Sequence, residues 1–200
     1  ILGNFISVGF FALIVVFQQE IRKFLLLLGS TNYTSRRSLI RYFNFLNQDE
    51  AKHVQLDLSL FVNACENMAK EKTGAIIVIE RSNSLDFVKS TGDSSSIKLS
   101  PQILESIFYK NSPLHDGAVI IKENTITATR VVLPVSESTT IPNHFGLRHR
   151  AGAGISEKTD ALVVVISEQR GEIVYIKDGR LEIFTSVEKL KRSLSEDLSL

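Results

Sequence analysis

The sequence predicts an α/β domain in which a mixed central β-sheet of about six strands is flanked by helices, with a membrane-associated helix before it. Apolar runs of strand length alternate with segments whose apolar residues recur at helical spacing, which is typical of layered α/β folds. The composition agrees, because 44% hydrophobic and 22% charged residues are ordinary for a globular domain. The length of 200 residues fits one domain and a small extra segment.

Charge and cysteine content exclude several classes of function. The formal net charge is +1, whereas non-specific binding to duplex nucleic acid needs a basic face, so no nucleic-acid partner is expected. The one cysteine, Cys65, excludes a disulfide framework and a zinc site built from several thiolates. The charge is uneven, since residues 1–41 carry +4 and residues 42–200 carry −3. The basic first part is therefore expected to lie near something anionic.

Residues 1–19 are predicted to be the end of a transmembrane helix. The run ILGNFISVGFFALIVVF is uncharged, but its 17 residues are fewer than the about 20 that span a bilayer, so a longer apolar segment is expected. The basic residues that follow it are Arg22, Lys23, Arg36 and Arg37. By the positive-inside rule they place the rest of the chain on the cytoplasmic side of the cell membrane. A buried core helix is the alternative, whereas a cleaved signal peptide would have its positive charge first.

Residues 20–50 are predicted to form a juxtamembrane amphipathic helix and a linker. Apolar residues recur at helical spacing from Ile21 to Leu28, and Gly29 with the polar residues after it ends the pattern. Such a helix would lie in the headgroup region of a bilayer. An ordinary helix docked on the soluble domain is the alternative.

Residues 51–200 are predicted to form one soluble domain, which begins with two helices and a buried strand. The elements expected in this half are a helix over 54–71, a strand over 74–80, a loop with little order over 81–96, and a helix from Ser100 to about Lys110. Helical spacing supports the first helix and places Cys65 and Met68 in the core. The continuous run GAIIVIE is typical of a strand buried on both faces. Ser100 followed by Pro101 fits an N-cap and the first helical position.

The second half is predicted to contain five more strands and two helices. The elements are strands over 118–122, 125–134, 161–167, 172–177 and 181–184, a loop over 135–145, a loop feeding a helix over 146–158, and a closing helix from Ser186. The strands are short apolar runs separated by turn residues, with Glu123 and Asn124 at a tight hairpin turn. Ser186 is expected to cap the closing helix.

Chemically interesting residues cluster in two segments, 112–120 and 142–152. The common motifs GxxxxGK[ST], GxGxxG, HExxH and GxSxG do not occur. In the first segment His115 and Asp116 come just before a strand, and Gly117 permits close backbone approach to a ligand. A carboxylate there can bind a hard cation or orient a hydroxyl nucleophile, and a plain Asp-Gly turn is the alternative.

The second segment contains Arg148, His149 and Arg150 in succession, between Gly146 and Gly152. Guanidinium groups match phosphate oxygens bidentately, and a helix N-terminus adds backbone N–H donors. A solvated run of charges is the alternative. An anion-binding loop beside a cation-binding carboxylate predicts phosphoryl or nucleotidyl transfer with a divalent metal.

The motifs LHDGAVII, GLRHRAGAGISE and SEQRG resemble, in their order and spacing, those of the diadenylate cyclase (DAC) domain family. The leader FFALIVVFQQEIRKFLLLLG resembles the end of the membrane segment of its membrane-anchored bacterial members. The resemblance implies a nucleotidyltransferase that condenses two ATP into cyclic di-AMP and releases two pyrophosphates. It also implies a divalent metal, Mn²⁺ or Mg²⁺ and sometimes Co²⁺, a face-to-face homodimer, and regulatory protein partners at the bilayer.

The resemblance further implies roles for individual residues. Asp116 is expected to help activate the 3′-hydroxyl group, and Arg148 and Arg150 to stabilise charge on the phosphates. The implied nucleotide-binding set is Gly117, Ala118, Val132, Leu133, Leu147, Arg148, His149, Arg150 and Ser167. The implied metal-binding set is His115, Asp116 and Glu168.

Two positions depart from the family pattern. Leu147 stands where the family usually has Thr, and the lost hydroxyl donor is worth roughly 1–3 kcal/mol if its hydrogen bond is buried and charge-assisted. Gln169 stands where the family usually has a second Glu, which is harmless only if Glu168 is the metal ligand. Two alternatives to the enzyme stay open, the first of which would follow from the change at Leu147. One is a catalytically weak nucleotide-binding sensor or scaffold of the same fold, and the other is a membrane-tethered interaction module without a nucleotide site.

Overall fold

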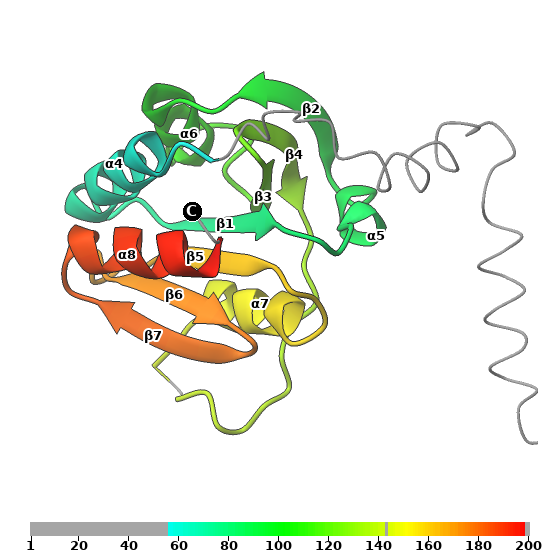
Figure 1. Ribbon diagram of the computed structural model, residues 1–200, viewed down its shortest axis with the longest axis vertical. Helices are drawn as coiled ribbons and strands as arrows, with labels where there is room; N and C mark the ends of the chain where they lie inside the picture. The colour runs from blue at the N-terminus through cyan, green and yellow to red at the C-terminus, as the bar shows by residue number, and fades with distance from the viewer. Residues whose placement is uncertain (1–55, 143, 199–200) are drawn as a thin grey trace, which may run out of the picture. The chain divides into compact units, whose positions relative to one another are not determined.

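The computed structural model describes residues 56–142 and 144–198, which form a seven-stranded mixed sheet with helices on both faces (Figure 1). The elements are α4 (Leu58–Lys70), β1 (Ala75–Glu80), α5 (Asp86–Lys89), β2 (Asp93–Lys98), α6 (Pro101–Phe108), β3 (Ala118–Lys122), β4 (Thr125–Val131), α7 (Leu147–Ser156), β5 (Leu162–Ile166), β6 (Ile173–Lys177), β7 (Arg180–Phe184) and α8 (Val187–Asp197). The predicted fold class is confirmed. The predictions for residues 1–19 and 20–50 lie outside the described residues, and within those residues no helix is long and apolar enough to cross a membrane.

The strand order is β2-β4-β3-β1-β5-β6-β7, with β1 in the middle. β1 runs parallel to β3 and antiparallel to β5, and the other neighbours are antiparallel. Ala75 at the start of β1 pairs with Ile166 at the end of β5, and Ala118 at the start of β3 pairs with Val131 at the end of β4. The beginnings of β1 and β3 and the ends of β4 and β5 therefore lie together at one end of the strands.

Two apolar layers cover the two faces of the sheet. In β1, Ile77 and Ile79 pack into the layer formed with α4, α6 and α8, whereas Ile76 and Val78 pack into the layer formed with α5 and α7. All six residues of β1 are buried, as expected for a central strand with both faces covered. The continuous apolar run that predicted this strand thus reflects burial on both sides.

Local capping sets the starts of the helices. The carboxylate of Asp57 accepts hydrogen bonds from Ser59 N and Leu60 N at the start of α4. The hydroxyl of Ser100 accepts from the third residue of α6, with Pro101 at the first position, as predicted. Cys65 is fully buried in α4, and burial raises the pKa of its thiol.

The prediction of a loop with little order over 81–96 is wrong. This segment contains the short helix α5 and most of β2, so the sheet has seven strands rather than about six. β2 lies at the edge of the sheet, and its residues DSSSIK are largely exposed. Pairing such as Asp93 with Thr129 holds it to β4. A polar edge strand of this kind carries no apolar run, because it buries little side-chain surface.

The predicted loop before the helix within 146–158 is also wrong, because α7 begins at Leu147 itself. Gly152 and Gly154 lie inside the helix where glycine favours a loop. An added Cβ at Gly152 would lie 2.8 Å from Ile176 Cδ1, and one at Gly154 would lie 2.3 Å from the carbonyl oxygen of Pro134. These glycines therefore bring α7 close to the sheet and to the chain that leaves β4.

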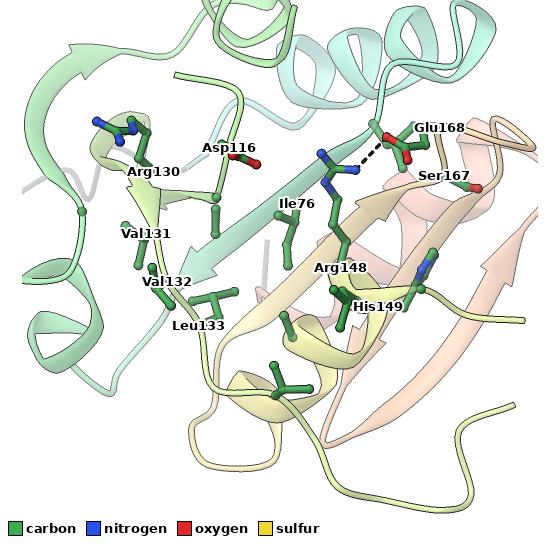
Figure 2. Close-up of a pocket in the computed structure, with 18 of the residues that line it drawn as sticks. Ile76, Asp116, Arg130, Val131, Val132, Leu133, Arg148, His149, Ser167 and Glu168 are labelled. Carbon is green, nitrogen blue, oxygen red and sulfur yellow. Dashed lines mark hydrogen bonds and ion pairs between the residues drawn. The ribbon is translucent and has the colours of Figure 1, made fainter. Parts of the chain in front are cut away.

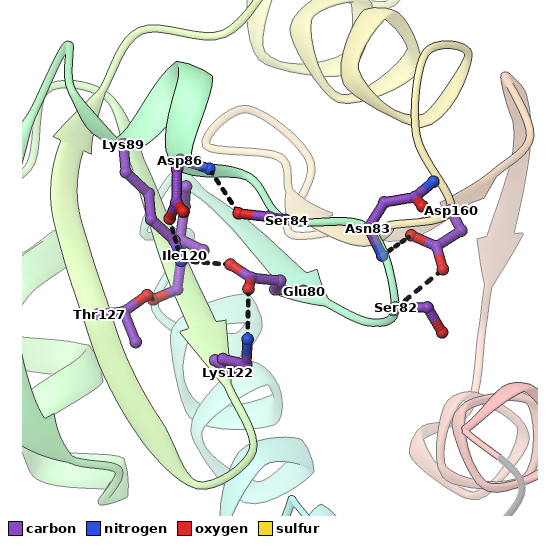
Figure 3. A network of polar contacts seen from close by, with 10 residues as sticks. All are labelled: Glu80, Ser82, Asn83, Ser84, Asp86, Lys89, Ile120, Lys122, Thr127 and Asp160. Carbon is purple, nitrogen blue, oxygen red and sulfur yellow. Dashed lines mark hydrogen bonds and ion pairs between the residues drawn. The ribbon is translucent and has the colours of Figure 1, made fainter. Parts of the chain in front are cut away.

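A buried ion cluster lies at the other end of the strands, where β1 and β3 end (Figure 3). The side chain of Glu80, at the end of β1, is 1% exposed and pairs with Lys89 of α5 and with Lys122 at the end of β3. The Lys122 Nζ to Glu80 Oε1 distance is 2.8 Å. Because the carboxylate is buried, losing either partner would leave an unfavourable uncompensated charge. The cluster fixes α5, and with it the turn that leads into β2.

Candidate active site

A pocket of about 920 Å³ opens at the end of the sheet where β1 and β3 begin and β4 and β5 end (Figure 2). Its volume is in the range of small-molecule sites. The pocket brings together most of the residues implied by the sequence, namely Asp116, Gly117, Ala118, Val132, Leu133, Leu147, Arg148, His149, Ser167 and Glu168. These come from segments far apart in the chain, so the fold unites the two clusters seen in the sequence.

Asp116 is exposed at the pocket, on the turn that enters β3. Gly117 next to it has a φ of 116°, and an added Cβ would lie 2.6 Å from the carbonyl carbon of Arg130. Only glycine fits this close approach without strain. The turn therefore packs directly against the end of β4 and holds the Asp116 carboxylate at the pocket.

The apolar wall of the pocket follows the end of β4. Thr91 Oγ1 accepts a hydrogen bond from Val132 N at 2.9 Å and donates to Val88 O at 2.7 Å. The side chain of Val132 is exposed, whereas Leu133 is buried. The hydroxyl of Thr91 thus ties the chain after β4 to the end of α5 and fixes the wall.

The opposite side of the pocket carries Arg148, in the first turn of α7. Its Nη1 donates to Glu168 Oε2 at 2.9 Å, across the start of β1 (Figure 2). The pair closes over Gly74, where an added Cβ would lie 2.8 Å from Arg148 Nη1. The beginning of α7 also lines the pocket, so the partial positive charge of the helix N-terminus would favour an anion there.

His149 lines the pocket but is 8% exposed, and neither ring nitrogen has a hydrogen-bond partner. Its ring lies 4.8 Å from that of Phe145, measured between centroids. Burial is the main cause of a lowered His149 pKa, which the Glu172 charge partly offsets and the Arg148 charge lowers further. The ring is therefore neutral at pH 7 and offers one donor and one acceptor nitrogen.

The free energy of unfolding is expected to fall as the pH drops below about 6.5, the value for an unperturbed histidine. In that range the unfolded chain binds a proton at His149 that the folded protein does not, so acid favours unfolding. His149→Gln should reduce the slope of unfolding free energy against pH below about pH 6.5. Denaturant titrations at several pH values measure it, and equal slopes for both proteins would contradict this assignment.

Two residues implied by the resemblance lie outside the lining of this pocket. Arg150 donates to the carbonyl oxygens of Ser138 and Ile141, each at 3.3 Å. Successive helical residues are about 100° apart, so Arg148 and Arg150 point to different sides of α7. His115 is the other residue outside the lining, and its Nδ1 lies 2.6 Å from the carbonyl oxygen of Ser112.

Several lining residues were missed by sequence reasoning. They are Ile76, Thr91, Asp93, Arg130 and His144, among others. Thr91 and Asp93 lie in the segment predicted to be a loop, and Arg130 lies within an apolar strand. The signal for Arg130 was a lone charge in TITATRVVLP, which a solvent-facing strand position explains equally well.

The donor set of the pocket fits a divalent cation only together with a ligand. No group of three or more His, Cys, Asp or Glu side chains that could hold a metal occurs among the described residues. Of the implied metal set, Asp116 is exposed at the pocket, Glu168 is paired with Arg148, and His115 lies outside the pocket lining. Mg²⁺ and similar hard cations often bind through one or two carboxylates plus substrate phosphates. Asp116 with a bound polyphosphate meets that description.

Comparison with known proteins gives consistent matches. Residues 62–181 match the family model described as DAC, DisA bacterial checkpoint controller nucleotide-binding. The chain is 38% identical over 192 residues to the cyclic di-AMP synthase CdaA of Bacillus subtilis, covering 96% of this chain and 67% of the relative. It is 38% identical over 190 residues to a diadenylate cyclase of Listeria monocytogenes, covering 95% of this chain and 66% of that protein. The chain thus spans about two thirds of the length of these relatives.

Solved structures agree with these matches. A double mutant of DacA from Staphylococcus aureus has 38% sequence identity and a TM-score of 0.69, covering 70% of this chain and 94% of its own. A Bacillus cereus structure, described as a hypothetical membrane spanning protein, has 39% identity and a TM-score of 0.64, covering 66% of this chain and 65% of its own. On sequence and on fold, the chain belongs to the diadenylate cyclase (DAC) family.

Proposed function

We propose that this chain is a diadenylate cyclase that condenses two ATP molecules into cyclic di-AMP and releases two pyrophosphates. The observation that carries the proposal is the single pocket in which the Asp116 carboxylate lies between an apolar wall and the Arg148 guanidinium (Figure 2). The names of the Bacillus subtilis and Listeria monocytogenes relatives support the same activity.

The pocket has separate regions that suit the parts of ATP. The apolar wall of Ile76, Val132 and Leu133 suits the flat adenine ring, as apolar linings do in most small-molecule sites. Arg148 and the start of α7 suit the phosphates, because guanidinium and helix N-terminal donors form strong hydrogen bonds with them. The ribose would then lie near Asp116 and Gly117.

Asp116 would act on the ribose. Its carboxylate accepts the proton of the 3′-hydroxyl while the 3′-oxygen bonds to the α-phosphorus of the facing ATP, and the bond from that phosphorus to the pyrophosphate oxygen breaks. Arg148 stabilises the negative charge on the phosphates as it is redistributed. The same step with the roles exchanged closes the ring.

A divalent metal, Mn²⁺, Mg²⁺ or Co²⁺, would be held by Asp116 together with phosphate oxygens. When bound, it supplies positive charge that stabilises the phosphates during transfer. The pocket lining favours this arrangement, since its carboxylates Asp93, Asp116 and Glu168 outnumber its guanidiniums Arg130 and Arg148. A polyphosphate entering without a cation would meet a net excess of negative side chains.

Turnover would need two copies of this chain, because one pocket of this kind holds a single ATP. A symmetric face-to-face homodimer supplies both halves with the same parts. We further propose that residues 1–19 anchor the chain in the cell membrane, that residues 20–50 connect the anchor to the catalytic domain at 51–200 on the cytoplasmic side, and that partner proteins regulate the encounter of two domains.

The test is a product assay with the full chain, ATP and Mn²⁺, Mg²⁺ or Co²⁺. Cyclic di-AMP and pyrophosphate are expected in a ratio of one to two, and none without metal. Chromatography against authentic cyclic di-AMP measures the product. Absence of product with every metal would contradict the proposed enzyme.

A second candidate function is a nucleotide sensor of the same fold. The observation that favours it is Leu147, a residue that is 76% exposed at the pocket where the family usually has a hydroxyl. A missing hydrogen bond costs less binding free energy at an exposed position than at a buried one. The change to Leu147 is therefore compatible with activity, and we favour the enzyme. Binding of ATP without product would favour the sensor. An interaction module without a nucleotide site would show no rise in melting temperature with ATP and metal.

A further inference from the structure

We propose that Arg130 is a second phosphate-binding residue of this site, which rests on Asp93 while the pocket holds no nucleotide. The inference deepens the proposed function and rests on it. Arg130 is absent from the set of residues that the family resemblance implies, and it lies on the wall of the pocket opposite Arg148.

The backbone holds Arg130 in an unusual conformation at the pocket. Its φ is 56°, in the left-handed region that a residue with a side chain seldom adopts. Gly117 packs against this backbone so closely that a Cβ there would lie 2.8 Å from the Arg130 Cα. Strained positions of this kind concentrate at functional sites. The position is therefore coupled directly to the turn that carries Asp116.

The side chain of Arg130 is placed to share the charge of a ligand. Figure 2 shows Asp116 between Arg130 on one side and Arg148 on the other. Among the described residues that line the pocket, these two arginines alone carry a permanent positive charge. Phosphate groups bound beside Asp116, such as those of a facing nucleotide, would therefore have Arg130 on one side and Arg148 on the other.

The contact of Arg130 with Asp93 is suited to exchange. The Nη1 to Oδ2 distance is 3.2 Å, and the two side chains are 51% and 56% exposed. An exposed ion pair of this kind contributes little to the stability of the fold. A guanidinium can instead bind phosphate through two parallel hydrogen bonds. Arg130 can therefore leave Asp93 for a phosphate at small cost.

A purely structural role is the competing explanation. Asp93 pairs with Thr129 across β2 and β4, so the ion pair could simply hold the edge strand in place. In that case Arg130 and Asp93 would be equivalent partners, and removing either would have the same effect. If Arg130 binds phosphate, removing Arg130 weakens nucleotide binding, whereas removing Asp93 does not.

The experiment uses the full chain, isothermal titration calorimetry with Mg²⁺, and two ligands, α,β-methylene-ATP and adenosine. The variants are Arg130→Asn, since Asn tolerates the left-handed conformation, and Asp93→Asn. Arg192→Gln is the matched control, because it breaks an exposed ion pair on α8 that does not line the pocket. Thermal unfolding of each variant checks the fold.

Arg130→Asn is expected to lower the affinity for α,β-methylene-ATP by at least about tenfold and to leave the affinity for adenosine unchanged. Asp93→Asn should bind the analogue at least as tightly as the parent chain, and Arg192→Gln should match the parent. Equal losses for Arg130→Asn and Asp93→Asn, or no loss for Arg130→Asn, would overturn the assignment. A parent that binds neither ligand would overturn both proposals, whereas a parent that binds ATP but makes no cyclic di-AMP would overturn the enzyme alone.

Discussion

Asp116→Asn is expected to reduce cyclic di-AMP formation by at least about 100-fold while ATP still binds. Asparagine is nearly the same size, so the turn at Gly117 and the shape of the pocket should persist. It cannot accept the proton of a 3′-hydroxyl group, and it is a weaker ligand for a hard cation. Initial rates of product formation under saturating ATP and Mn²⁺ measure the effect, and calorimetry with ATP measures the binding.

The matched control for this substitution is Asp178→Asn. Asp178 lies at the turn between β6 and β7, with a φ of 49° that Asn also tolerates, and it does not line the pocket. Its rate of product formation should equal that of the parent chain. A normal rate for Asp116→Asn would show that another group takes up the proton.

Gly117→Ala is expected to lower the free energy of unfolding by roughly 2–5 kcal/mol and to remove activity. The methyl group would meet three backbone atoms of Arg130 at 2.6–2.9 Å, and the φ of 116° is strained for alanine. Backbone atoms cannot move aside as a flexible side chain can, so the turn must shift away from β4. Asp116 would move with it.

Gly146→Ala is the control for adding a methyl group to a glycine of the same pocket. No atom lies within 4 Å of a Cβ there, and the backbone is extended, so the cost should stay below about 1 kcal/mol, the loss of a good N-cap residue. Denaturant unfolding of the two variants measures the difference. A cost for Gly117→Ala as small as that for Gly146→Ala would show that the turn is loosely packed.

The elements predicted correctly are those whose cause lies within a few residues. Ser100 and Pro101 start α6 through one side-chain hydrogen bond and one fixed backbone angle, and both are visible in the sequence. β1 is a continuous apolar run because both of its faces are covered. Such signals need no knowledge of the rest of the fold.

The elements that were missed depend on partners far away in the chain. β2 has no apolar run, and its backbone pairing with β4 is what makes it a strand. Gly152 and Gly154 favour a loop by propensity, yet close contacts with β6 and with the chain after β4 allow a helix there. Tertiary packing overrides local preference in both cases.

The candidate site shows the same division. Asp116 and Arg148 lie in separate sequence motifs, and the fold brings them together with the end of β4 in one pocket. The sequence could not show that Arg148 lines the pocket and Arg150 does not. That difference depends on the helix that begins at Leu147, where a loop was predicted. Arg130 carries no motif of its own, and its place at the pocket follows from the packing of Gly117 against its backbone.

The burial of Cys65 gives this chain a practical advantage for spectroscopy. Since the single native thiol is inaccessible to reagents, a cysteine introduced at the exposed position of Leu147 would be the one group that a maleimide or spin label modifies. If two copies of the chain pair as proposed, spin labels at this position would report the separation of their pockets by double electron–electron resonance, with no background from the native thiol.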